Sequence, residues 1–233
     1  MSGSHKTRPV QLPLDLPHRP AMAADDFLVA ESNRAAVAWL DRWPNWPAPA
    51  LAIHGPAGCG KSHLAQVWRA RTGAPLVRPA DLDIATLPGL LPAAVPAVVI
   101  DDALGVAGDP VRERALFHLY NLARDAGGHL LLAATTAPSQ WGLTLPDLRS
   151  RLNAAPAVAL GPPDDALLAA VLVKLFADRQ IRIGTEVVEY LVVHMERSFD
   201  AARTLVARID AAALAARRRI TVPLAREILT GGP

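Results

Sequence analysis

The most informative segment of the sequence is Leu51-Ala52-Ile53-His54-Gly55-Pro56-Ala57-Gly58-Cys59-Gly60-Lys61-Ser62. Its second part, residues 55–62, matches the phosphate-binding pattern G-x-x-x-x-G-K-[ST] in full. Glycines let the backbone wrap around phosphate oxygens, and the dipole of a following helix attracts anions. An apolar run over 51–54 predicts a buried strand before this loop, and 62–72 predicts a helix after it. An ordinary glycine-rich turn is the alternative, but it would not need this strand–loop–helix context.

The P-loop pattern predicts how each residue type would contact a nucleotide. Lys61 is expected to reach the β- and γ-phosphates, and the Ser62 hydroxyl to ligate Mg²⁺. Cys59 occupies a variable position of the pattern, so we interpret it as a small buried thiol. The predicted nucleotide-binding residues of this segment are Gly55, Pro56, Ala57, Gly58, Cys59, Gly60, Lys61, Ser62 and His63.

Polar residues follow two further predicted strands. Val98-Val99-Ile100-Asp101-Asp102 is an apolar run that ends in two carboxylates, about 40 residues after the P-loop. Asp101 is expected to hold Mg²⁺, and Asp102 to orient or deprotonate an attacking water. Thr135 and Thr136 follow the run 129–134, where a hydroxyl could contact the γ-phosphate or the water. A plain pair of strand-end threonines is an equally good interpretation.

Composition excludes several classes of protein. Of the 233 residues, 51% are hydrophobic and 20% charged, which is enough for a core and excludes wholesale disorder. The net charge of +2 does not support a histone-like nucleic-acid coat. A single cysteine allows no internal disulfide and fits a reducing cytosol. Without a signal-peptide pattern or an apolar run near the roughly 20 residues of a membrane span, we expect a soluble, cytoplasmic protein with no membrane contact.

The order of the predicted elements indicates an extended arm followed by two domains. Residues 1–26 show little periodic pattern. Residues 27–161 alternate short strands and helices, which favours a parallel α/β sheet, whereas 162–233 contain helices alone. Ser32, Asp164, Thr185 and Thr221 stand where helix caps would lie. Strands are predicted over 51–54, 76–78, 97–100, 129–134 and 158–160, and helices over 32–42, 62–72, 111–126, 164–179, 185–196, 199–217 and 223–229.

This order of motifs resembles the AAA+ ATPases, more closely their DnaA-related group, and most closely the Hda family in its alphaproteobacterial form. Besides the P-loop and the Asp and Thr pairs, the resemblance is carried by 11–20, 26–33, 145–152 and 195–199. It covers almost the whole chain from residue 11 onward. It implies an AAA+ P-loop domain with a central parallel sheet, followed by a small helical lid, and ADP or ATP with Mg²⁺ as cofactors.

The resemblance also implies roles for residues outside the P-loop. Phe27, Leu28 and Val29 would line the adenine pocket. Arg151, within Ser-Arg-Leu, would be an arginine finger that acts on a nucleotide held by a neighbouring subunit, with Arg149 as a helper. On the residues alone, a solvated surface charge is the alternative for either arginine.

The sequence departs from the family pattern in the lid and between two strands. The third lid helix of the family carries a nucleotide-sensing arginine, but that position falls here on Ala201 or Asp200, and Arg203 comes too late. Because this arginine is missing, we expect weak or no ATP hydrolysis by the chain itself. Only about 20 residues separate Arg78 from Asp101, which leaves no room for the initiator's DNA-handling insertion, and no helix-turn-helix segment follows the lid. We expect direct DNA binding to be weak or absent.

The predicted arm contains Gln11-Leu12-Pro13-Leu14-Asp15-Leu16, which fits the pattern Q-x-x-L-x-[LF] of peptides that dock on the bacterial sliding clamp. Leu14 and Leu16 would enter an apolar groove, and the Gln11 amide would hydrogen-bond at its edge. The alternative is a strand-like stretch that packs on its own domain.

The resemblance, together with the clamp pattern, implies a regulator of replication initiation, with DnaA, the sliding clamp and a second copy of the chain as partners. The finger would stimulate hydrolysis of ATP held by DnaA and so prevent re-initiation. A self-sufficient P-loop ATPase such as a helicase loader is the alternative, and it would not need a clamp peptide. A small-molecule kinase is disfavoured by the helical tail and by the Ser-Arg segment.

Overall fold

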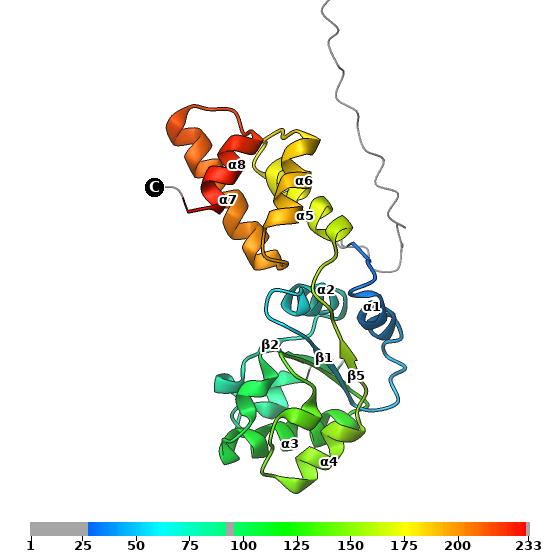
Figure 1. Cartoon of the computed structure of the whole chain (residues 1–233). Coiled ribbons are helices and arrows are strands. Elements are labelled where there is room, and N and C mark those ends of the chain that lie inside the picture. Colours follow the sequence, from blue (N-terminus) through cyan, green and yellow to red (C-terminus); the bar gives the residue numbers. More distant parts are fainter. Residues whose placement is uncertain (1–27, 92–95, 232–233) are drawn as a thin grey trace, which may run out of the picture. The chain divides into compact units, whose positions relative to one another are not determined.

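The computed structural model describes residues 28–91 and 96–231 (Figure 1). They fall into two compact units, one that runs through Pro163 and one that starts at Asp164. The predicted arm, with Gln11, Leu14 and Leu16, lies outside the described residues, and so does Phe27. The two units are described separately below.

The first unit is built on a five-stranded sheet with the order β2-β3-β4-β1-β5. Every neighbouring pair is parallel, as the alternation of strands and helices predicted. The central strands β1, β3 and β4 are buried almost throughout, which is why they read as continuous apolar runs. The strands are β1 Ala50–His54, β2 Leu76–Val77, β3 Ala97–Ile100, β4 His129–Ala134 and β5 Ala157–Ala159.

Helices cover both faces of this sheet, α1 and α2 on one face and α3 and α4 on the other (Figure 1). Successive side chains of β1 alternate between the faces: Leu51 and Ile53 pack with α1 and α2, whereas Ala50 and Ala52 pack with α3 and α4. The result is a three-layer α/β/α sandwich. The helices are α1 Arg34–Asp41, α2 Lys61–Thr72, α3 Pro110–Asp125 and α4 Pro146–Ala154.

Helix α4 and four short 3₁₀ turns carried no prediction from the sequence. The turns are Pro79–Asp81, Leu87–Leu90, Ala103–Val106 and Pro138–Gln140. Helix α4 has nine residues, of which Leu148 and Leu152 are buried, so its apolar periodicity is too short to read.

The start of α1 differs from the prediction. The buried face of α1 consists of Ala36, Val37 and Leu40. The N-cap position, however, is Asn33 and not Ser32. The buried Asn33 side chain accepts from the Ala30 amide at 2.9 Å and donates to the Leu28 carbonyl at 2.9 Å, so it ties down the segment before the helix. The prediction of Ser32 as the cap was wrong. Asn33 takes that position because its buried amide side chain can bond both the Ala30 N–H and the Leu28 carbonyl.

Tryptophans pack together where the chain passes from α1 to β1. Trp43 meets Trp68 edge-on, with ring centroids 5.9 Å apart, and Trp46 stacks on Trp68 at 5.5 Å. The Trp46 ring nitrogen donates to the Trp39 carbonyl at 2.8 Å. Trp43 and Trp46 thus pack on Trp68 of α2, a residue that is distant from them in sequence.

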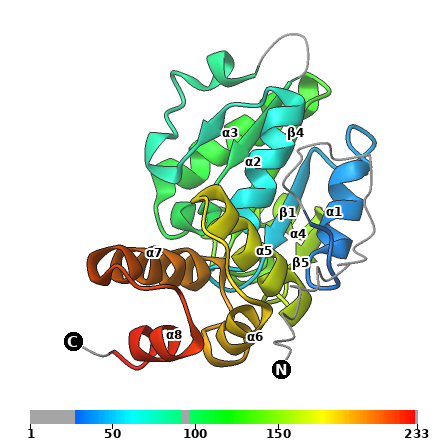
Figure 2. The same cartoon turned by 90° about the horizontal axis from the view of Figure 1, so that it is seen from above.

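The second unit contains the helices α5 to α8, drawn from yellow to red in Figure 2. Its core includes Leu172, Phe176, Leu191, Val206 and Ile209. Among the described residues, no helix is long and apolar enough to cross a membrane. The helices are α5 Asp165–Asp178, α6 Thr185–His194, α7 Phe199–Ala216 and α8 Val222–Leu229.

Caps in this unit follow the prediction only in part. The Asp164 carboxylate accepts from the Leu167 amide at 2.8 Å and caps α5 as predicted. Thr185 is the first residue of α6, and Gly184 takes the N-cap position instead. Thr221 stands at the N-cap of α8 without a side-chain cap bond. The Ser198 hydroxyl caps α7, a role that was not predicted.

Candidate functional site

The backbone of the loop between β1 and α2 favours glycine at several positions. Gly58 and Gly60 have φ of 69° and 100°, in the left-handed region. A Cβ on Gly55 would lie 2.2 Å from the Leu160 carbonyl oxygen, so a side chain cannot fit there. The glycines of the motif therefore set the shape of the loop and its close approach to the strand end after β5.

The Lys61 side chain folds back over this loop. Its Nζ donates to the carbonyl oxygens of Gly55 at 2.8 Å and of Pro56 at 2.7 Å, and lies 3.7 Å from the Cys59 sulfur. Cys59 is buried, as expected of a small packed thiol. These partners are all neutral, so the ammonium can exchange them for phosphate oxygens, which bind it more strongly.

The Ser62 hydroxyl, at the start of α2, donates to Asp101 Oδ1 at 3.2 Å. The same carboxylate oxygen accepts from the Asp102 amide at 3.0 Å. Two motifs that are 39 residues apart therefore meet at the carboxyl ends of β1 and β3. A hydroxyl and a carboxylate are oxygen ligands of the kind that Mg²⁺ prefers. Asp102 is exposed and has a left-handed φ of 53°, which projects it from the end of β3.

The two threonines after β4 have different surroundings. The Gly55 amide donates to the Ala134 carbonyl at 3.3 Å, so the exposed Thr135 follows directly beside the P-loop. Thr136 is half-buried, and its carbonyl accepts from the Trp141 ring nitrogen at 2.9 Å. Of the predicted pair, Thr135 has the more accessible hydroxyl at this edge.

The segment with Leu28 and Val29 lies at the same end of the sheet. The Gly161 amide, next to the Leu160 that contacts Gly55, donates to the Ser32 carbonyl at 3.0 Å. Leu28 and Val29 are half-buried, and Val29 packs against the core beneath α1 and α2.

Charge and burial at the P-loop act on His54, the last residue of β1. Burial lowers the pKa of His54, and the nearby Lys61 ammonium lowers it further. This imidazole is therefore neutral at pH 7. The described residues contain no group of three or more His, Cys, Asp or Glu side chains that could hold a metal ion.

Arg151 is held against the neighbouring helix. Its guanidinium donates to Asn121 Oδ1 and lies over the rings of Phe117 and Tyr120, at 4.7 and 5.5 Å from their centroids. All three partners belong to α3, whereas Arg149 is exposed on α4. The half-buried, stacked Arg151 is thus not the freely solvated charge that its sequence context alone allowed.

Glu113 is a buried acid that no motif in the sequence marks as functional. It lies on the core side of α3, with a fully buried side chain. Burial by itself would raise the pKa of Glu113, but hydrogen bonds from the Leu145, Thr144 and Gly108 amides and from the Thr144 hydroxyl lower it overall. The spacing could have indicated this burial. Glu113 precedes Leu116 by three residues and Tyr120 by seven, so it lies on the apolar face of an amphipathic helix.

Asp200 and Ala201, where the resemblance would place an arginine, make other contacts. The Ala201 amide donates to the Ser198 hydroxyl at 3.0 Å, and Asp200 pairs with Arg203 one turn later on α7. Arg203 is therefore engaged by its own helix in the lid unit.

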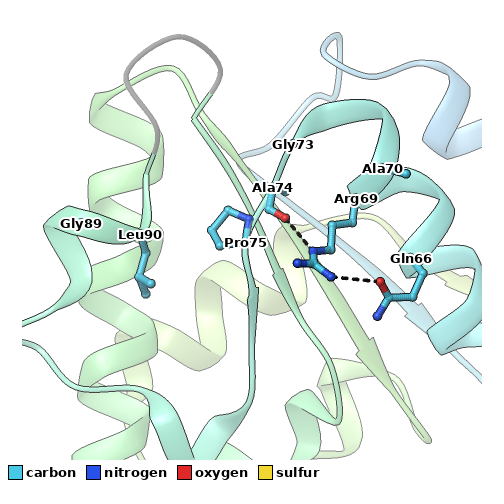
Figure 3. Close-up of a pocket in the computed structure, with 8 residues that line it drawn as sticks. All are labelled: Gln66, Arg69, Ala70, Gly73, Ala74, Pro75, Gly89 and Leu90. Atoms are coloured by element: carbon cyan, nitrogen blue, oxygen red, sulfur yellow. Dashed lines mark hydrogen bonds between the residues drawn. The ribbon is translucent and has the colours of Figure 1, made fainter.

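A hollow of about 480 Å³ lies at the other end of α2 (Figure 3). Arg69 spans it, donating to the Ala74 carbonyl at 3.1 Å and to the Gln66 side chain at 3.3 Å. None of the predicted site residues that the structure describes lines this hollow. The candidate site is instead the open edge of the sheet above the P-loop.

Comparison with known proteins places this geometry in a family context. Residues 165–229 match the family model "Hda, lid domain". An uncharacterized protein of Haemophilus influenzae is 29% identical over 190 residues, which are 78% of this chain and 81% of that protein.

Solved structures share the fold. Domain III of the replication initiation protein DnaA from Thermotoga maritima has a TM-score of 0.75 at 19% identity, covering 92% of this chain and 98% of that one. AMPPCP-bound DnaA from Aquifex aeolicus has a TM-score of 0.67 at 18% identity, covering 84% and 67%. The match to the lid model and the shared fold confirm the resemblance predicted from the sequence: the chain has the AAA+ fold of DnaA and carries a lid domain of the Hda family.

Proposed function

We propose that this DnaA-related protein is a nucleotide-bound adaptor that limits replication initiation by stimulating hydrolysis of ATP held by DnaA. Arg151 supplies the arginine finger, and the arm with Gln11, Leu14 and Leu16 docks on the sliding clamp. The Hda lid domain and the DnaA-type fold support the coarse part of this proposal. The finger and the clamp contact are its finer parts.

One observation carries the proposal furthest: among the described residues, the polar and ring partners of Arg151 all lie on α3, and none belongs to the P-loop of its own chain. A planar guanidinium that does not contact the nucleotide site of its own chain is suited to contact a nucleotide that is bound by a neighbouring subunit. Such a finger stabilises charge on the transferring phosphoryl group, and in GTPases it raises kcat by roughly 10³- to 10⁵-fold.

The residues at the P-loop fit a resident nucleotide. The cradle has no room for a Cβ at Gly55, and Lys61 covers it with an ammonium that has only neutral partners. In this proposal the loop amides, Lys61 and His63 hold the phosphates of ADP or ATP, and Ser62 and Asp101 hold Mg²⁺. Leu28 and Val29, together with Phe27, line the adenine pocket.

Hydrolysis by the chain itself is proposed to be weak. Asp102 and Thr135 or Thr136 would orient a water at the end of β3 and β4. The lid offers no arginine at Asp200 or Ala201, and Arg203 is paired with Asp200. The resident nucleotide therefore acts in structure and switching more than in turnover.

The test is single-turnover hydrolysis of ATP pre-bound to DnaA, with the clamp loaded on DNA. Wild type is compared with Arg151→Ala and with the double variant Gln11→Ala/Leu14→Ala. The control is Arg71→Ala, which removes a surface ion pair to Asp41 on the opposite helical layer. Stimulation by wild type and the control, with loss of roughly 10³-fold in Arg151→Ala, supports the finger.

Two other results would redirect the assignment. Loss of stimulation in Arg151→Ala but not in the arm variant would remove the clamp from the proposal. If wild type hydrolyses ATP alone and leaves DnaA-bound ATP unchanged, the adaptor proposal fails and the self-sufficient ATPase or loader takes its place.

A further inference from the structure

Glu113 is a buried carboxylate that has no part in the nucleotide chemistry proposed above. Its Oε2 accepts from the Leu145 amide at 2.7 Å, from the Thr144 amide at 2.9 Å and from the Thr144 hydroxyl at 2.8 Å. Its Oε1 accepts from the Gly108 amide at 3.0 Å and the Thr144 amide at 3.1 Å. A charged acceptor with this many bonds is a strong local constraint, because bonds to an ionised group are stronger than neutral ones.

These bonds fix the start of α4. Leu145 is the N-cap residue of α4, and its side chain makes no cap bond. The chain at Thr144 and Leu145 therefore relies on α3 for its hydrogen-bond acceptors. Without Glu113, the Thr144 and Leu145 amides would lose this acceptor. Loss of a hydrogen-bond partner is unfavourable by up to about 1–3 kcal/mol where water does not replace it.

The same face of α3 also holds Arg151. Phe117 and Asn121 follow Glu113 by four and eight residues, and Tyr120 follows it by seven, so all four side chains share one face of the helix. Glu113 binds the N-terminus of α4, while Phe117, Tyr120 and Asn121 bind the guanidinium further along it. Helices α3 and α4 are thus connected at two places, with Arg151 roughly 9 Å beyond Leu145 at the usual helical rise.

We infer that Glu113 is the positioning residue of Arg151: by anchoring Thr144 and Leu145 it fixes the register of α4 on α3, and so the place of the guanidinium. The catalytic consequence rests on the proposed function, whereas the placement of Arg151 does not. A misplacement of about 1 Å of a catalytic group can lower a rate by up to roughly 10²-fold.

The experiment uses Glu113→Gln, which preserves shape but replaces one charged acceptor oxygen by an NH₂ group that faces amide donors. Asp109→Asn is the matched control, because the Asp109 side chain caps α3, accepting from the Val111 amide at 2.9 Å and from the Arg112 amide at 3.2 Å. Thr144→Val, which deletes one of the bonds, serves as a milder second variant. All variants are compared well below their Tm.

The first readout is the NMR resonance of the Arg151 side-chain Nε–H group in the full-length protein without DnaA. We expect Glu113→Gln to move this resonance toward that of a free arginine, Thr144→Val to move it less in the same direction, and Asp109→Asn to leave it in place. The second readout is the single-turnover rate constant for DnaA-bound ATP at saturating protein. We expect a decrease of about 10-fold or more in Glu113→Gln, with the half-saturating concentration unchanged.

The inference is overturned if Glu113→Gln lowers Tm but moves neither the resonance nor the rate constant, since Glu113 would then only stabilise the fold. If Glu113→Gln does not fold, an unshifted resonance in Thr144→Val overturns it equally. If wild type does not stimulate hydrolysis, the proposed function fails, and the Arg151 resonance alone still decides the positioning role.

Discussion

The Ser62 hydroxyl donates a hydrogen bond to Asp101 Oδ1 at 3.2 Å, across 39 residues of sequence. Ser62 lies in the first turn of α2 and Asp101 follows β3, which is separated in the sheet from the P-loop strand β1 by β4. The pair forms because all the strands are parallel and their carboxyl ends share one edge.

This pairing predicts how Mg²⁺ affects nucleotide binding. Ser62→Ala and Asp101→Asn should each remove about 1.4 kcal/mol or more of the Mg²⁺-dependent part of the binding free energy, a loss on the order of 10-fold in affinity. Titration of ADP with and without Mg²⁺ by calorimetry measures that part. Asp125→Asn, a surface acid on α3 that pairs with Arg124, is the control. Equal losses with and without Mg²⁺ would contradict a metal-ligand role.

The Lys61 ammonium predicts a specific loss of phosphate binding. Lys61→Met should weaken ADP binding by on the order of 100-fold, because a charged hydrogen bond of about 2–3 kcal/mol is lost. Fluorescent-nucleotide binding gives the affinity, and the ligand-free Tm tests the fold. Lys174→Met removes an exposed i,i+4 pair to Asp178 and should change neither property measurably. Unaltered ADP affinity in Lys61→Met would contradict the P-loop interpretation.

Close packing predicts a penalty for a single methyl group at Gly55. Gly55→Ala should lower the free energy of unfolding by about 1–3 kcal/mol, because its Cβ would meet backbone that cannot move aside. Gly89→Ala is the matched control, since nothing lies within 4 Å of its Cβ and its φ is not positive. Its effect should stay within about 0.5 kcal/mol. Denaturant unfolding followed by tryptophan fluorescence compares the two, and equal stability would show that the loop relaxes.

The lowered pKa of Glu113 predicts a loss of stability in acid. A carboxyl whose pKa in the folded protein lies below its ordinary value of 4.5 adds stability that is fully present above that value. This stability is lost as the pH falls from 4.5 through the lowered pKa, because the unfolded chain takes up the proton first. Unfolding free energies of Glu113→Gln should depend less on pH in this window than those of wild type. Parallel curves for the two proteins would show that Glu113 does not titrate with unfolding.

Much of the fold could be predicted from local pattern. The apolar runs before the P-loop, before Asp101 and before Thr135 became β1, β3 and β4, because strands buried on both faces must be apolar throughout. Cap choices at Asn33 and Gly184 could not be predicted in this way. Which side chain is buried at a helix start, and what backbone groups it meets, depends on the packing of the whole unit.

The candidate site also combines features that a local sequence pattern predicts with features that it does not predict. The glycines and Lys61 form a contiguous motif whose chemistry is local, so the P-loop, the α/β class and the helical lid can be inferred without coordinates. Three contacts could be found only in the folded chain: Ser62 meets Asp101, Arg151 stacks on α3, and Glu113 anchors α4. Those contacts join segments about 30 to 40 residues apart, and they arise because parallel strand order and helix packing, rather than chain neighbours, determine which side chains meet.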